Sequence, residues 1–364
     1  MPSHDTVIIG GGALGAACAW ELASTGRKVL IVEGSGQAGQ AWRAAAGMLA
    51  PQIETNAGDP LLRLGLAGRD YYGGLAARLQ ETVGVDLGLW QDGIARVART
   101  EGEAEQLRRQ VAWQQKQGLN CEWLTQDDVR RHWPWLAPTE GALRAPDDGA
   151  LDPERLVEGL LAGAQMLGAA LTSDTALAVL GSGPRVEGVR GEVRSYFAGE
   201  VVVAAGAWSG LLEGLPRRLQ VRPVRGQMAA LPWPDDIPRA IIYHKDSYLL
   251  ARRGEAVIGS TMEEAGFRPE VTTSGLAQIF SATLSLCPGL LRAKVRRTWA
   301  GLRPMTPDGL PIVGPESRLE GLWYATGHGR NGILLAGITG MLLRQLMDRV
   351  EPAYDLLAFS AERF

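Results

Sequence analysis

The stretch Thr6-Val-Ile-Ile-Gly-Gly-Gly-Ala-Leu-Gly15 joins a short apolar run to the pattern Gly-x-Gly-x-x-Gly. The apolar run predicts a buried β-strand, and the alanine-rich segment from Ala13 to Thr25 predicts a helix that begins on the glycines. Gly26 ends this helix, and a second apolar strand runs from Lys28 to Glu33. This strand–turn–helix–strand order is typical of a dinucleotide-binding fold.

The glycines and the acid each have a physical role in such a unit. We expect Gly10 to form the tight turn, Gly12 to let the backbone approach a pyrophosphate, and Gly15 to allow close packing of helix on strand. The free N–H groups at the start of the helix attract phosphate oxygens. Glu33 can accept hydrogen bonds from ribose hydroxyls and would repel a 2′-phosphate.

The choice between NAD and FAD depends on residues beyond the glycines. Ala19, Leu22, Gly26 and Val29 extend the pattern in the form found in FAD-binding two-domain oxidoreductases. The stretch from Val201 to Gly206, a second strand followed by glycine, resembles the adenosine-side segment of those flavoproteins. Both features favour FAD.

The α/β signals lie at the start, middle and end of the chain of 364 residues. Asp152-Pro-Glu154 predicts a helix start, and the strand from Leu322 to Gly327 leads into a helix from about Gly332. Alternation from Val221 to about Met262 predicts an antiparallel sheet between these signals. We therefore expect an α/β fold that combines a discontinuous Rossmann-type FAD-binding domain with a second α+β substrate domain on an antiparallel sheet. The predicted division assigns residues 1–85, 150–219 and 300–364 to the FAD-binding domain, and residues 86–149 and 220–299 to the substrate-binding domain.

The composition excludes several classes of protein. With 37 Lys and Arg against 40 Asp and Glu, the net charge of −3 predicts no basic surface for nucleic acid or an anionic membrane. No apolar run approaches the roughly 18 residues that span a bilayer, and the chain opens directly into a strand, which leaves no room for a signal peptide. Cys18, Cys121 and Cys287 lie far apart and have no metal-ligand spacing to a histidine. We expect a reduced, cytoplasmic protein with no catalytic metal.

Three further stretches narrow the family. They are Ala44-Ala-Ala-Gly-Met-Leu-Ala50, Trp299-Ala-Gly-Leu-Arg-Pro304 with the following Thr306-Pro-Asp-Gly-Leu-Pro-Ile-Val-Gly314, and Gly327-His-Gly-Arg-Asn-Gly-Ile-Leu-Leu335. Together with the N-terminal pattern they resemble the D-amino-acid oxidase superfamily, and most closely the glycine oxidases of the thiamine pathway. The resemblance covers nearly the whole chain, and its motifs follow the family's order.

The resemblance implies FAD-dependent oxidative deamination of glycine or a similar small amine, such as sarcosine or a small D-amino acid. Hydride transfer to flavin N5 and reduction of O2 to H2O2 would follow from it, as would a role in thiamine thiazole biosynthesis and a homotetramer. Noncovalent FAD is expected because no cysteine lies near Arg303. Two alternatives stay open: a D-amino-acid or sarcosine dehydrogenase with another electron acceptor, and a non-catalytic flavin-binding protein.

The resemblance also implies two groups of site residues. For the substrate, Arg303 matches a carboxylate-binding arginine, Tyr248 a tyrosine on the same carboxylate, Arg330 a second arginine, and Met262 a pocket wall or an ordinary core methionine. The FAD positions are Gly10, Gly12, Ala13, Leu14, Gly15, Glu33, Gly34, Ala41, Trp42, Ala46, Gly47, Met48, Leu177, His328, Gly329, Arg330, Asn331, Gly332, Ile333 and Leu334.

Two departures from the family pattern leave the substrate preference open. Asp246 and Ser247 precede Tyr248 where glycine oxidases carry His and Cys, and Gly329 stands where a larger residue is expected. We assign no general base, because transfer of hydride from Cα needs none when the amine arrives neutral. His244 and His328 are interpreted as satisfied structural imidazoles.

Overall fold

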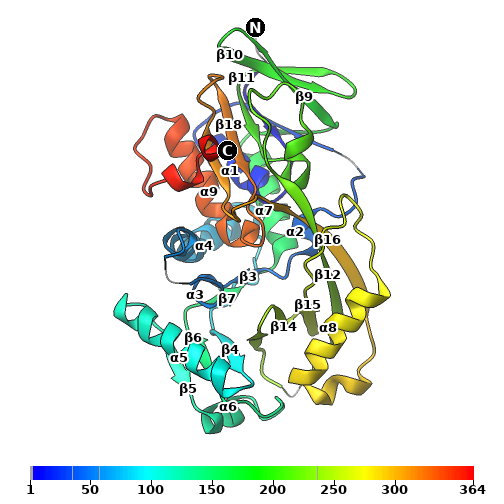
Figure 1. The fold of residues 1–364 in the computed structure, drawn as a ribbon. Helices are drawn as coiled ribbons and strands as arrows, with labels where there is room; N and C mark the ends of the chain where they lie inside the picture. Colours follow the sequence, from blue (N-terminus) through cyan, green and yellow to red (C-terminus); the bar gives the residue numbers. More distant parts are fainter. Residues whose placement is uncertain (1–2, 35, 57, 236) are drawn as a thin grey trace.

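The structure is a computed structural model and describes residues 3–34, 36–56, 58–235 and 237–364. In Figure 1 a first sheet and its helices occupy the upper part of the molecule, and a second sheet with its own helices occupies the lower part. The expected α/β architecture with two sheets of different kinds is confirmed.

Parallel strands form the centre of the first sheet. Ile8 and Ile31 pack with Cys18 and Leu22 of the first helix, whereas Val7 packs on the opposite face of the sheet. Both faces are therefore buried, which explains the uninterrupted apolar runs. In spatial order the parallel strands are β8 (Ala170–Ser173), β2 (Val29–Glu33), β1 (His4–Ile9), β11 (Ser195–Val203) and β18 (Leu322–Thr326). Antiparallel strands extend the sheet: β17 (Ile312–Pro315) on β18, and the hairpin β9 (Ala176–Ser182) and β10 (Arg185–Gly191) on β11.

Four longer helices pack together on one face of the first sheet. The helix that follows the glycine turn ends at Ala23, two residues before the expected end. The Asp152 carboxylate caps the helix that begins at Pro153 by accepting from the N–H groups of Glu154 and Arg155. The four helices are α1 (Ala13–Ala23), α4 (Leu61–Val83), α7 (Pro153–Met166) and α9 (Gly332–Met347).

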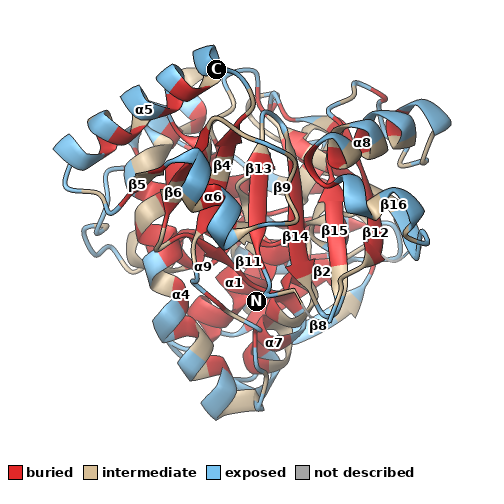
Figure 2. Ribbon diagram, turned by 90° about the horizontal axis from the view of Figure 1, so that it is seen from below, coloured by how far each residue is buried: buried red, intermediate tan, exposed pale blue. Residues whose placement is uncertain are grey.

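The second sheet combines two distant parts of the chain. Its strands are β16 (Arg297–Met305), β12 (Arg222–Pro232), β15 (Glu255–Gly259), β14 (Ser247–Arg252), β13 (Ile241–His244), β4 (Ile94–Ala98), β6 (Gly141–Ala145) and β5 (Glu122–Leu124), in that order. Neighbours are antiparallel except β13 and β4, which join the two parts. Figure 2 shows buried central strands and helices with exposed outer faces: α5 (Glu101–Lys116), α6 (Gln126–His132) and α8 (Thr273–Leu286).

The distribution of strands bears on the domain division. Strands of the first sheet fall in residues 1–85, 150–219 and 300–364, and most strands of the second fall in 86–149 and 220–299. The exception is β16, which belongs to the second sheet but runs across residue 300 to Met305. We propose the same division with this boundary placed after Met305.

Two features are absent from the described residues. No helix in them is both long and apolar enough to cross a membrane. They also contain no cluster of three or more His, Cys, Asp or Glu side chains that could hold a metal ion. The three cysteines are buried and unpaired by disulfides.

Candidate functional site

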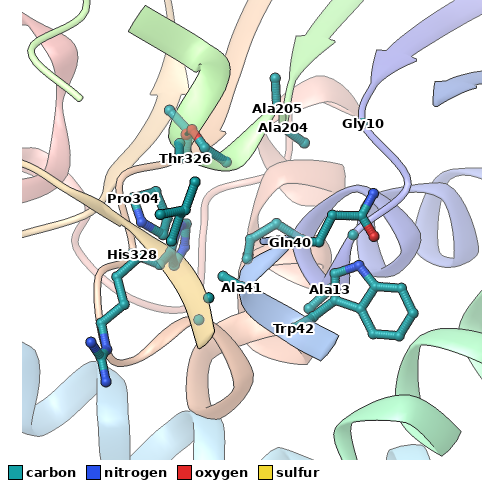
Figure 3. A pocket seen from close by; sticks show the side chains of 18 of the residues that line it. Gly10, Ala13, Gln40, Ala41, Trp42, Ala204, Ala205, Pro304, Thr326 and His328 are labelled. Carbon is teal, nitrogen blue, oxygen red and sulfur yellow. Dashed lines mark hydrogen bonds between the residues drawn. The ribbon is translucent and has the colours of Figure 1, made fainter. Parts of the chain in front are cut away.

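A cavity of about 460 Å³ lies where the two sheets meet. One wall comes from the carboxyl ends of β1, β2 and β18 and the turn after β11, and the other from β12, β14 and β16. Ligands of open α/β sheets bind at this carboxyl edge. Figure 3 shows Ala13 and Trp42 on one side of the cavity, with Pro304 and His328 on the other.

The glycine turn forms one end of the cavity. Gly10 has a φ of +100°, and a Cβ there would lie 2.5 Å from the carbonyl oxygen of Ala204. A Cβ at Gly15 would lie 1.8 Å from the carbonyl oxygen of Gly10, so the helix can sit on the strand only with glycine at this position. Helix α1 begins at Ala13 with no side chain capping its first turn, which leaves its N–H groups to a ligand.

Glu33 is fixed at the end of β2. Its Oε2 accepts from the Gly11 N–H at 2.5 Å, and its Oε1 accepts from Gln40 Nε2 at 2.7 Å. The carboxylate therefore faces the cavity in a defined orientation, beside the glycines.

A second helix start lines the same cavity beside the first, since a Cβ at Gly332 would lie 3.7 Å from Leu14 Cδ2. Helix α9 begins at Gly332, its preceding residue Asn331 makes no capping bond, and both residues line the cavity. Nearby His328 is 1% exposed and lies 3.1 Å, through Nε2, from Thr339 Oγ1. Desolvation by burial lowers the pKa of His328 to about 3, so the imidazole is neutral at physiological pH.

The paired helix starts fit FAD. The partial positive charge at α1 suits a pyrophosphate, and that at α9 suits the electron-rich edge of a flavin ring. Both helix starts line the cavity together with the carboxylate of Glu33, and this combination of donors and acceptor suits the charges of this cofactor.

Arg303, on β16, is a half-buried cation at the substrate end of the cavity. Its Nη1 donates to the carbonyl oxygen of Thr261 at 3.1 Å, and its Nη2 donates to Ser260 Oγ at 2.7 Å. No carboxylate in the part of the chain that the structure describes pairs with it, and desolvation lowers the pKa of the guanidinium from its ordinary value. A cation that is largely withdrawn from solvent and has no counterion favours an anionic partner, so this wall is suited to an anionic ligand.

The guanidinium of Arg303 lies over Gly226 of β12. A Cβ at residue 226 would lie 2.1 Å from Nη1 and 2.4 Å from Cζ. Glycine at this position therefore makes the space that the cation occupies.

Tyr248 of β14 lines the same cavity and is 5% exposed. Its hydroxyl donates to Met228 Sδ at 3.1 Å. Burial raises the pKa of Tyr248, so the phenol stays protonated and can donate a hydrogen bond to an anion beside Arg303.

Arg330 forms an ion pair with a residue that the sequence reading missed, Glu54. Glu54 Oε1 accepts from Arg330 Nη2 at 3.0 Å and from the Tyr243 hydroxyl at 2.7 Å. Glu54 is the main cause of the raised pKa of Arg330, so this guanidinium stays charged.

The short helix α3 (Pro51–Glu54) places Glu54 at the cavity. Asp148 Oδ2 accepts from the N–H groups of Gln52 at 3.1 Å and Ile53 at 3.3 Å, while its Oδ1 accepts from Arg69 Nη1 at 3.0 Å. A buried carboxylate thus holds the start of α3, and with it the position of Glu54.

The comparisons with known proteins agree with this geometry. The family described as FAD dependent oxidoreductase matches residues 5–346. This chain belongs to that family. Its cofactor is FAD.

Relatives of this FAD dependent oxidoreductase cover nearly all of its length. Glycine oxidase from Geobacillus kaustophilus is 34% identical over 99% of this chain and 97% of its own, and a crystal structure of glycine oxidase from that organism superposes with a TM-score of 0.94 at 33% identity, covering 100% of both chains. The bifunctional protein ThiO/ThiG of Nostoc sp. is 34% identical over 95% of this chain, which corresponds to 53% of that longer protein.

The structure of this FAD dependent oxidoreductase brings nearly all the predicted site residues to one cavity. The cavity is lined by Gly10, Gly12, Ala13, Leu14, Glu33, Gly34, Ala41, Trp42, Ala46, Gly47, Met48, Leu177, Tyr248, Arg303, His328, Gly329, Arg330, Asn331, Gly332, Ile333 and Leu334. Gly15 lies behind this wall, where it packs against Gly10.

Met262 is not brought to the cavity. Its side chain is 46% exposed and is not part of the lining, although Ser260, two residues earlier, is. The thioether at the substrate end belongs instead to Met228, which is 2% exposed. The family resemblance implies Met262 as a pocket wall, whereas it implies no role for Met228.

The two departures from the family pattern also have defined positions. Asp246 lines a neighbouring cavity of about 290 Å³ rather than the main one. Gly329 has a φ of +55°, and a Cβ there would lie 2.8 Å from Met305 Sδ. The space beside Gly329 is therefore taken up by Met305.

Proposed function

We propose that this protein oxidises the C–N bond of a small amino acid that carries one carboxylate, with glycine as the first candidate and O2 as the final electron acceptor. The observation that supports this most is the half-buried guanidinium of Arg303, which has no carboxylate partner among the described residues and lies with Tyr248 in the cavity lined by the proposed FAD-binding residues.

The proposed roles of the protein groups are binding and orientation. Arg303 grips both oxygens of the substrate carboxylate, and Tyr248 donates to one of them. FAD, held by the residues at the two helix starts and by Glu33, would supply the two-electron redox chemistry that couples oxidation of the substrate to reduction of O2 to H2O2. The imidazole of His328 stays neutral and adds no charge to the wall of the cavity.

Among the described residues, we assign no cavity-lining carboxylate as a general base. Among the described residues, the carboxylates that line the cavity are Glu33, Glu54 and Glu213. Glu54 is paired with Arg330 and Tyr243, and Glu213 pairs with Arg190 at the Leu177 side. The substrate amine must therefore reach the site already neutral, and orientation of Cα is the main contribution of the protein.

Likeness to the glycine oxidases and to a ThiO/ThiG protein supports a role in thiamine thiazole biosynthesis, noncovalent FAD and a homo-oligomeric state as parts of the same proposal. A dehydrogenase that uses another electron acceptor is the alternative.

Anaerobic titration of the purified holoenzyme tests the proposal. Glycine, sarcosine, D-alanine and D-proline are added separately, and loss of the flavin absorbance identifies a substrate. Admission of air should restore the colour and produce peroxide. Failure of every amine to bleach the flavin would reject amino-acid oxidation, and bleaching that air does not reverse would favour the dehydrogenase.

A further inference from the structure

Three charged groups surround the substrate end of the cavity. The guanidinium groups of Arg303 and Arg330 supply two positive charges, and Glu54 supplies one negative charge. The nearby hydroxyls of Tyr243 and Tyr248 stay neutral, because burial raises the pKa of both phenols. The formal charges of Arg303, Arg330 and Glu54 add up to one positive charge, which balances the charge of a single substrate carboxylate.

The carboxylate of Glu54 forms an ion pair with only one of the two arginines. Glu54 Oε1 lies 3.0 Å from Arg330 Nη2, whereas Arg303 donates only to neutral oxygens of Ser260 and Thr261. Arg330 thus forms an ion pair with Glu54, whereas Arg303 forms no ion pair with a described residue.

This ion pair also faces the second cavity, of about 290 Å³. Glu54, Arg330, Asn331 and Leu334 line both cavities. The side chains of Glu54 and Arg330 are 22% and 27% exposed, so the pair can be reached from the second cavity. A substrate bound to Arg303 and extended toward this wall would meet Arg330 and Glu54 next.

We propose that Glu54 determines the charge specificity of the enzyme: by neutralising Arg330 it leaves one cation for the substrate, and it excludes amines that carry a second carboxylate. This inference rests on the proposed binding of the substrate carboxylate at Arg303. Its physical basis is that a second carboxylate would meet a carboxylate already in place and a guanidinium already paired.

Glu54→Gln tests the idea because it removes the charge and keeps the shape. The amide oxygen can still accept from the Tyr243 hydroxyl, while Arg330 loses its counterion. The double variant Glu54→Gln with Arg330→Gln restores the sum of one positive charge. A role of Glu54 that is only structural predicts no return toward wild type in the double variant.

Glu200→Gln is a matched control. The Glu200 side chain is 24% exposed and is also paired with an arginine, Arg27, but it lines neither cavity. It changes the net charge of the protein by the same amount, away from the site.

Two pairs of probes differ by one carboxylate. Acetate and malonate are titrated against each holoenzyme by the change in flavin absorbance, which needs no turnover. Sarcosine and iminodiacetate, which are N-methyl and N-carboxymethyl glycine, are compared by kcat/KM.

For Glu54→Gln we expect both ratios, malonate over acetate affinity and iminodiacetate over sarcosine kcat/KM, to rise at least tenfold. The control should stay within twofold of wild type, and the double variant should return toward wild type. A ratio unchanged in Glu54→Gln while acetate still binds, or an equal rise in the control, would overturn the inference.

Arg330→Gln gives an independent test if Glu54→Gln does not fold. It leaves Glu54 unpaired, so the malonate-to-acetate ratio should fall below the wild-type value; a rise or no change would count against the inference. If wild-type holoenzyme binds neither acetate nor malonate, the proposed carboxylate site itself fails, which separates the two ideas.

Discussion

Replacing Gly226 with alanine should impair substrate binding by displacing the guanidinium of Arg303, without removing any functional group from the site. The new Cβ would lie 2.1 Å from Nη1, 2.4 Å from Cζ and 2.4 Å from Nη2 of Arg303, whereas ordinary contact begins at 3.4 Å. The guanidinium must therefore move by about 1.3 Å, which breaks its 2.7 Å bond to Ser260 Oγ. Misplacement of a positioning group by about 1 Å can cost on the order of 100-fold in rate, or about 2.7 kcal/mol.

The assay is kcat/KM for glycine together with the affinity for acetate, measured by flavin absorbance. We expect Gly226→Ala to lower kcat/KM by about 100-fold and to weaken acetate binding, while FAD content stays normal. Gly73→Ala is the control, because a Cβ at this position of α4 meets nothing within 4 Å. If Gly226→Ala keeps kcat/KM within twofold of wild type, Arg303 does not hold the substrate in the position described.

The remaining predictions concern the two ends of the cavity and its buried histidine. Arg303→Ala should weaken carboxylate binding by roughly 2–5 kcal/mol with FAD still bound, and an unchanged KM together with unchanged acetate affinity would remove Arg303 from the site. Gly15→Ala should yield protein that has lost FAD, because the new Cβ would lie 1.8 Å from the backbone oxygen of Gly10; the ratio of absorbance at flavin and protein wavelengths measures this, and normal FAD content would contradict it. His328 has a pKa of about 3 when folded against roughly 6.5 when unfolded, so its neutral form favours the folded state above the unfolded pKa, and this contribution is lost as pH falls from 6.5 toward 3. Urea unfolding should show a loss on acidification of at most about 5 kcal/mol from this residue, absent in His328→Asn, and parallel pH curves for the two proteins would contradict it.

Local features of the sequence were enough to predict the dinucleotide-binding unit. The strand, the glycine turn and the helix from Ala13 lie within a continuous segment, so their apolar pattern and glycine spacing predict both structure and ligand. The helix after Asp152 was predicted for the same reason, since its cap and first turn are adjacent in the chain. The region from 86 to 149 was harder to interpret, because its strands β4, β5 and β6 are short, and β4 joins the rest of its sheet by pairing with β13, more than a hundred residues away.

The sequence by itself determined the cofactor-binding end, because one continuous segment, from Gly10 to Glu33, supplies the glycines, the helix start and the acid. At the substrate end, family resemblance implied Arg303, Tyr248 and Arg330, but only the tertiary structure decided what surrounds them. Glu54 meets Arg330 across 276 positions of sequence, and Gly226 makes room for Arg303 on the neighbouring strand. Met228 rather than Met262 lies beside Tyr248 for the same reason. Side chains brought together by sheet pairing and by the packing of two domains leave no periodic pattern in the chain, so their charges and contacts can be read only once the fold is in place.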